Sequence, residues 1–251
     1  MIKINVFVLK GKHILAVALL LLVGAAVLVS TQGMTVFKAG KRSLPIYSAD
    51  SQDKVCAVTF NCAWGNGDID KILATLEEYN SKATFFIVGD WAEKFPDDLK
   101  KIHKAGHEIG THSYDHKDYT KLSDEEIIED VKKCDNIISE ITGITPKLVR
   151  VPSGAYDSRV IDTLEKQGKM CIQWSCDSID YNDASAEDIY NRSILLEQGG
   201  ILLMHTGTKN TALALPRVLS NLTGRFKTVT MSELIPTTDF SIDSNGTVHF
   251  N

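Results

Sequence analysis

Two pairs of side chains in this sequence have the types and spacing that metal-assisted hydrolysis requires. His112 and His116 lie four residues apart, which on one helical turn brings both imidazoles within reach of a single cation such as zinc. His205 follows a short apolar run, and Asp180 could hold one ring nitrogen so that the imidazole acts as a general acid towards a departing amine. Each pair alone also fits ordinary packed or turn-forming residues, so the prediction depends on the fold that positions them.

Arg150 ends another apolar run and precedes a turn that contains Pro152 and Gly154. A guanidinium in such a position commonly orients a carboxylate, and the turn could aim a backbone N–H at a developing oxyanion. Asp177 follows the apolar segment 170–174, although an aspartate there is also a typical turn residue. The residues with catalytic chemistry therefore all follow apolar segments.

The segments that precede these residues predict a parallel sheet. Seven apolar or β-branched runs alternate with helical patterns, which include a capping box at residues 123–126. Alternation of this kind favours a parallel barrel or an open doubly wound sheet, and a barrel gathers all the polar residues at one rim. The predicted strands are 55–60, 83–88, 108–111, 147–151, 170–175, 201–204 and 226–229, and the clearest predicted helices are 68–79, 123–142, 158–167 and 186–197.

The amino-terminal part predicts a membrane attachment. Residues 14–29 are apolar and uncharged, with Lys3, Lys10 and Lys12 upstream, which favours an uncleaved transmembrane anchor over a signal peptide. The lysines predict a cytoplasmic amino terminus. We therefore expect a single-pass protein of the cell membrane whose folded domain lies outside the cell. We expect an anchor or signal peptide at 1–30, an extracellular linker at 31–53, a folded domain at 54–235 and a C-terminal tail at 236–251.

Composition excludes some partners. The chain has 251 residues and a formal net charge of -5, without a basic cluster on the folded part. We therefore do not expect it to bind nucleic acid. Its 5 cysteines are odd in number and lack the spacing of a disulfide framework or a structural zinc site. No protein partner is predicted.

Five ordered motifs resemble those of the polysaccharide deacetylases of carbohydrate esterase family 4, which carry the nodulation-type deacetylase domain. The resemblance covers about residues 54–235, and the single anchor together with residues 63–66 is similar to the cell-wall and sporulation-associated branch. It implies a distorted (β/α)7-type barrel of parallel strands behind one transmembrane helix. It also implies a metal-dependent hydrolase that removes acetyl groups from N-acetylated, peptidoglycan-like polysaccharide. The motifs are residues 58–62, 111–116, 150–154, 177–181 and 203–206.

The resemblance assigns a role to each motif residue. A divalent metal is implied, zinc in the first place, with cobalt, manganese and nickel as alternatives. Tyr181 stands where the family usually has tryptophan and still supplies an aromatic wall. The implied roles are metal ligation for His112 and His116, orientation of the base for Arg150, an oxyanion contact from the Ser153 backbone N–H, tuning of the acid for Asp180, and the acid itself for His205.

The first motif departs from the family. Two adjacent aspartates, a base and a metal ligand, are expected where this chain has Asn61 and Cys62. An amide cannot accept a proton from water at neutral pH, whereas a thiolate is a good zinc ligand, so Cys62 is expected to complete the metal site. Asp68 is an alternative ligand or base, and it also fits the N-cap of the helix that follows.

Three functions are compatible with this pattern. The leading one is an enzyme that acts on carbon–nitrogen bonds, other than peptide bonds, in linear amides, with altered chemistry at Asn61. The second is a catalytically inactive relative that keeps its groove as a glycan-binding or scaffolding module. The third uses Cys62 as a thiol nucleophile.

Overall fold

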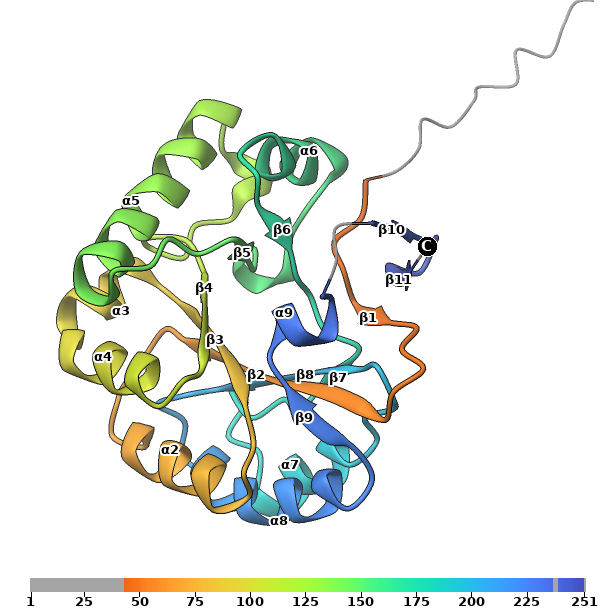
Figure 1. Cartoon of the computed structure of the whole chain (residues 1–251). Helices are drawn as coiled ribbons and strands as arrows, with labels where there is room; N and C mark the ends of the chain where they lie inside the picture. Colours follow the sequence, from red (N-terminus) through yellow and green to blue (C-terminus); the bar gives the residue numbers. More distant parts are fainter. Residues whose placement is uncertain (1–42, 237–238, 251) are drawn as a thin grey trace, which may run out of the picture. The chain divides into compact units, whose positions relative to one another are not determined.

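The structure, a computed structural model, describes residues 43–236 and 239–250. The predicted anchor at 1–30 lies outside these residues. Within the part of the chain that the structure describes, none of the helices combines the length and the apolar character needed to span a bilayer. The described chain is an α/β unit in which helices surround a curved parallel sheet (Figure 1).

The sheet follows the order β6-β5-β4-β3-β2-β8-β7, and β9 pairs with the first residues of β2. All of these pairings are parallel, as the alternation of strands and helices predicts. All seven predicted strands are present, with β5 and β6 shorter than expected, and β7 is an additional strand of this sheet that was not predicted. The strands are β2 Val55–Cys62, β3 Ala83–Ile87, β4 Glu108–Thr111, β5 Leu148–Val149, β6 Met170–Cys171, β7 Cys176–Asp177, β8 Ile201–His205 and β9 Lys227–Val229.

The short connection between β6 and β7 requires the sheet to curve. These strands lie at opposite ends of the strand order, yet only residues 172–175 join them. Seven flat strands at about 4.8 Å spacing place their outer members roughly 29 Å apart. Four linking residues reach no more than about 18 Å. The sheet therefore bends into a half-barrel, which is consistent with the predicted (β/α)7 fold.

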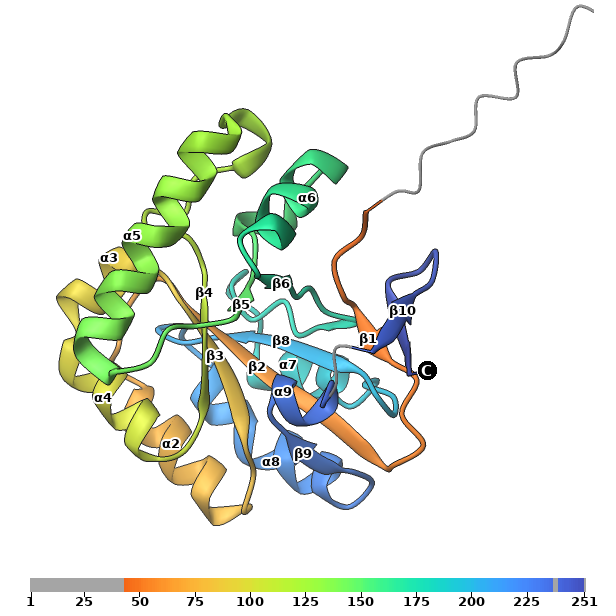
Figure 2. The same cartoon turned by 45° about the horizontal axis from the view of Figure 1, so that its top comes forward.

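Most of the helices lie on the outer face of the curved sheet (Figures 1 and 2), whereas the last short helix, residues 231–234, packs with Ala57, Phe86 and Ile201 on the inner face. The capping box predicted for α5 is confirmed, because Ser123 accepts from the Glu126 backbone while Glu126 accepts from the Ser123 backbone. Gly143, in the left-handed region at φ 80°, ends this helix. The helices are α2 Ile69–Glu78, α3 Gly89–Lys94, α4 Pro96–Lys104, α5 Asp124–Thr142, α6 Ser158–Lys166, α7 Ala186–Ser193, α8 Thr211–Thr223 and α9 Met231–Leu234, with short 3-10 turns at Tyr119–Lys121 and Pro152–Gly154.

The predicted boundaries at both ends need correction. The linker was expected to extend to residue 53, but β1 (Ser48–Ala49) pairs with β11 (Thr247–Phe250), and Ile46 is buried. The tail expected from residue 236 includes β10 (Phe240–Ile242), which pairs with β11 in an antiparallel hairpin. Residues 46–49 alternate too briefly for a periodic signal, and their partners lie about 200 positions later, so the local sequence did not reveal this small sheet.

A buried ion pair fixes α5 against the end of β4. Lys169 donates to Asp135, and Thr111 donates to the other carboxylate oxygen of Asp135. Lys169 also donates to the Pro146 carbonyl, so both charges are neutralised and hydrogen-bonded inside the fold. Because Thr111 directly precedes His112, this network helps to place one of the predicted metal ligands.

We expect Asp135→Ala to lower the free energy of unfolding by about 3–5 kcal/mol, because it leaves the Lys169 ammonium buried without a counter-ion. Asp90→Ala removes the exposed Lys94–Asp90 pair and is the matched control, with an expected loss below about 1 kcal/mol. Chemical denaturation of both variants measures the difference. Equal losses would mean that the buried pair contributes no more than a surface pair.

Candidate active site

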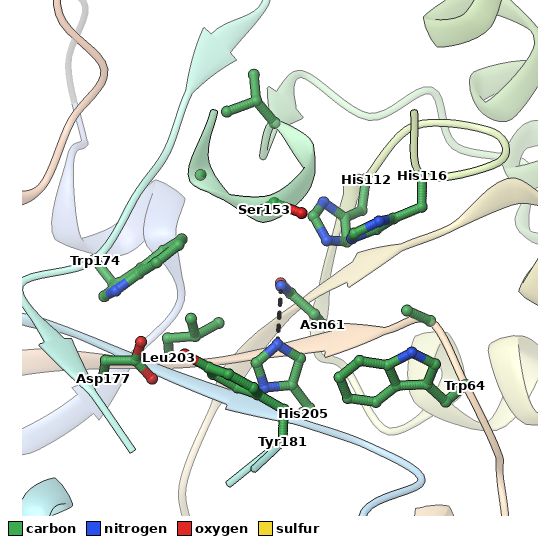
Figure 3. A pocket seen from close by; sticks show the side chains of 13 residues that line it. Asn61, Trp64, His112, His116, Ser153, Trp174, Asp177, Tyr181, Leu203 and His205 are labelled. Atoms are coloured by element: carbon green, nitrogen blue, oxygen red, sulfur yellow. Dashed lines mark hydrogen bonds between the residues drawn. The ribbon is translucent and has the colours of Figure 1, made fainter. Parts of the chain in front are cut away.

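The predicted catalytic residues meet in one pocket at the carboxyl ends of the strands (Figure 3). Asn61 of β2 and His205 of β8 are register partners in the ladder, and residues that follow β4, β5 and β7 complete the wall. The three histidines expected in a common cleft do share it. The lining residues are Asn61, Ala63, Trp64, His112, His116, Val151, Ser153, Gly154, Trp174, Asp177, Tyr181, Leu203 and His205.

His205 is held by a buried carboxylate. Its Nδ1 lies 2.7 Å from Asp180 Oδ1, and its backbone N–H donates to Asp180 Oδ2 at 2.7 Å. The Thr211 hydroxyl, in the first turn of α8, also donates to Asp180 Oδ2. Because the Asp180 carboxylate accepts from Nδ1, the orientation of the imidazole ring is fixed and Nε2 faces the pocket. The predicted pairing of Asp180 with His205 is therefore present.

Arg150 is completely buried, and its guanidinium contacts an amide where a carboxylate was expected. Nη1 donates to Asn61 Oδ1 at 3.0 Å, Nη2 to the Gln173 carbonyl at 3.0 Å, and Nε to the Ile172 carbonyl at 3.3 Å. The guanidinium also lies 4.1 Å from the centre of the Phe86 ring. Burial lowers the pKa of Arg150 to about 9.

These bonds fix the orientation of the Asn61 amide. A guanidinium only donates hydrogen bonds, so the oxygen of Asn61 faces Arg150 and its NH₂ group faces His205. Asn61 Nδ2 lies 3.4 Å from His205 Nε2, which must then be the acceptor (Figure 3). Because Nε2 accepts, the ring proton of neutral His205 resides on Nδ1, where it is donated to Asp180.

The two predicted metal-binding histidines are adjacent, with ring centroids 4.9 Å apart in an edge-to-face arrangement. The expected helical turn is wrong: residues 112–118 form a loop in which Ser113 and His116 have positive φ. His112 Nδ1 donates to the Arg150 carbonyl at 2.8 Å, which leaves Nε2 available. Burial, and to a smaller extent the nearby His116, keeps the pKa of His112 well below its ordinary value. The ring is therefore neutral, as a metal ligand must be.

The prediction for Cys62 is wrong. Successive residues of a strand point to opposite faces. Asn61 faces the pocket, so the adjacent Cys62 faces the helices and is fully buried in the core with Phe60 and Ile69. Burial raises the pKa of this thiol to about 12. Cys62 is therefore neither a pocket ligand nor an activated nucleophile.

Asp68 does not line the pocket either. Its Oδ1 accepts from the Gly207 backbone at 2.8 Å, and its side chain does not cap α2. Burial raises the pKa of this carboxyl group. Asp68 occupies the predicted N-cap position of α2, but its side chain connects the loop after β2 to the turn after β8 and is not placed for the expected catalytic role.

Ser153 and Tyr181 lie at the pocket as expected. Ser153 adopts φ 55° within the turn formed by Pro152–Gly154, and Tyr181 packs edge-on against His205 with ring centroids 5.2 Å apart. Trp64 and Trp174 also line the pocket, and sequence reasoning missed both. Trp64 follows a predicted strand end, whereas Trp174 lies within the predicted strand 170–175, so the two positions shared no common signal.

The side chains present do not make a complete catalytic zinc site. Such a site normally has three protein ligands and one open position. Two imidazoles are suitably placed, but Cys62 faces the core and both polar ends of Asn61 are engaged. Within residues 43–236 and 239–250, no cluster of three or more histidine, cysteine, aspartate or glutamate side chains is suited to hold a metal ion. The donor set is one ligand short.

The chain is similar to several known proteins. A family model described as polysaccharide deacetylase matches residues 48–172. The uncharacterized Bacillus subtilis protein YlxY is 33% identical over 77% of this chain and 61% of its own length. A Bacillus cereus peptidoglycan-N-acetylglucosamine deacetylase is 36% identical over 54% of this chain and 50% of its own length. This chain therefore spans less than two thirds of either relative.

Solved structures also resemble this chain. The wild-type form of a carbohydrate esterase family 4 pseudoenzyme from Bacillus anthracis has a TM-score of 0.73 at 30% identity, covering 76% of this chain and 69% of that one. A mutant of that pseudoenzyme with restored enzymatic activity has the same TM-score. Together with the pocket and its ordered motifs, these similarities show that the chain belongs to the polysaccharide deacetylase family, carbohydrate esterase family 4.

Proposed function

We propose that this chain binds N-acetylated cell-wall glycan of the peptidoglycan type in its strand-end pocket, and that its hydrolysis of the acetamide bond is limited by position 61. The glycan is inferred from the deacetylase relatives and from a pocket walled by aromatic rings and polar groups. The limit on hydrolysis is inferred from one observation: the Asn61 amide is held between Arg150 and His205.

Hydrolysis of an acetamide requires a group that takes a proton from water and another that gives a proton to the departing amine. The Asn61 oxygen is directed at Arg150 and has no useful basicity. His205 carries its ring proton on Nδ1, towards Asp180, while Nε2 accepts from the Asn61 amide. In this arrangement the base expected at position 61 is missing, and the neutral form of His205 has no ring proton facing the pocket.

An active deacetylase is the second candidate. The buried pairing of Asp180 with His205 favours it, since a pocket that only binds sugar has little use for an oriented imidazole. The contact between Asn61 and His205 is also long, at 3.4 Å, so it is readily displaced. A substrate or water that displaced the amide would free Nε2 for proton transfer.

We further propose that His112 and His116 hold a divalent ion, with zinc preferred over cobalt, manganese or nickel. Deacetylases of this family are generally metal-dependent, and a metal in such a site supplies an activated water. The neutral state of His112 and its hydrogen bond to the Arg150 carbonyl support ligation. With one protein ligand missing, the affinity of this site should be lower than that of a complete site.

The membrane attachment is also a proposal. The uncharged run at 14–29, with lysines upstream, supports a single-pass anchor and an extracellular folded domain. Such a location would place the pocket on the same side of the membrane as the cell-wall glycan.

Asn61→Asp should increase acetate release from N-acetylated peptidoglycan and chitooligosaccharides, assayed with added zinc. A positioned base typically contributes 10² to 10⁴-fold, so a rise of about that size is expected. The double variant with His205→Ala is the control and should return to the parent level, because the acid is removed. If the parent protein releases acetate as fast as Asn61→Asp does, another group already transfers the proton.

Zinc binding tests the two histidines and the corrected position of Cys62. Equilibrium dialysis should find zinc bound to the parent protein and to Cys62→Ser, because this thiol faces the core. His112→Ala should lose the ion, since a single imidazole remains. Circular dichroism verifies that both variants are folded. Loss of zinc in Cys62→Ser, with the fold intact, would contradict the orientation described for Cys62.

A further inference from the structure

Trp64 is the most exposed aromatic side chain at the pocket. Its exposed fraction is 50%, and its ring stacks on the imidazole of His205 with centroids 5.1 Å apart and planes 28° apart. In Figure 3, Trp64 lies on one side of the pocket and Trp174 on the other, with His205 and Asn61 between them. One face of the Trp64 indole therefore meets protein, while much of the ring remains open to solvent.

The backbone around Trp64 is fixed. The adjacent Gly65 accepts a hydrogen bond from the indole N–H of Trp91 at 3.1 Å. Gly65 also packs closely on Gly207, where an added Cβ would lie 2.4 Å from the Gly65 nitrogen. Gly207 is further held by Asp68. The indole ring therefore projects from a loop that is braced on both sides, so it loses little freedom when a ligand binds.

The exposure of this ring leaves apolar surface in water that a bound ligand would cover. A tryptophan whose only task was to shield His205 would be stable when packed more deeply, as Trp91 is, with an exposed fraction of 1%. An open indole face beside polar groups suits a pyranose ring, whose axial C–H bonds form an apolar face while its hydroxyl and acetamido groups point outward.

We propose that Trp64 is a sugar-stacking residue that holds a hexosamine ring of an N-acetylated glycan at the edge of the pocket. The inference rests on the proposed function, and it adds the side chain that supplies much of the binding energy. Trp64 follows the substituted first motif, so stacking at this position retains glycan even when the adjacent Asn61 prevents rapid hydrolysis. Loss of the indole should weaken binding without altering the pocket behind it.

Isothermal titration of the full-length protein with N-acetylchitotetraose tests the proposal. Trp64→Ala should raise the Kd roughly tenfold or more, a change of about 1.4 kcal/mol for each factor of ten. Trp64→Phe retains an aromatic face and should remain within about threefold of the parent. Leu213→Ala is the matched control, because Leu213 is 64% exposed on α8 and does not line the pocket.

Fluorescence gives a readout that a purely structural role would not change. Ligand binding should shift the tryptophan emission of the parent protein, and most of this shift should be absent in Trp64→Phe although that variant still binds. If the parent binds and Trp64→Ala binds equally well, the stacking role is overturned while the proposed function stands. If the parent binds no N-acetylated glycan, the proposed function fails and the stacking role fails with it.

Discussion

The buried guanidinium of Arg150 is the constraint on which the pocket depends. Arg150 follows β5, and its guanidinium donates to the carbonyls of Ile172 and Gln173 after β6 and to Asn61 near the end of β2. One side chain thus connects three parts of the curved sheet. A guanidinium has no acceptor, so every neighbour must accept from it. That requirement orients the Asn61 amide, and the amide in turn selects the tautomer of His205. Through Asn61, a buried cation thereby favours one tautomer of the neutral histidine at the end of β8.

The same arrangement shows what the substitution at position 61 changes. A carboxylate there would neutralise the charge of Arg150 and accept a proton, whereas the amide keeps the hydrogen bond and loses both functions. On the proposed function, the pocket keeps its oriented imidazoles and its aromatic walls, while the amide at position 61 limits proton transfer. Binding of a ligand depends on the retained features, and hydrolysis depends on the altered ones. This separation explains why a deacetylase fold with an unusual first motif can keep a well-formed pocket.

Much of the fold could be predicted from the chain because its signals are local. The capping box of α5, the glycine that ends this helix and the seven apolar strands each depend on neighbouring residues. The convergence of His112, His116 and His205 could also be predicted, since the carboxyl ends of parallel strands share one edge. The small sheet of β1, β10 and β11 could not, because its strands are short and their partners lie far apart in the sequence.

The sequence by itself determined which chemical groups are available: two histidines for a metal, a third beside an aspartate, and an amide where a base is expected. The tertiary structure decided which of them meet. Strand alternation directs Cys62 into the core although it adjoins Asn61, and a loop with positive φ, rather than a helical turn, brings His116 to His112. Bonds from Arg150, 89 positions away, fix the face that Asn61 presents. The type of a residue is a local property, whereas the direction of its side chain depends on partners that only the folded chain brings near.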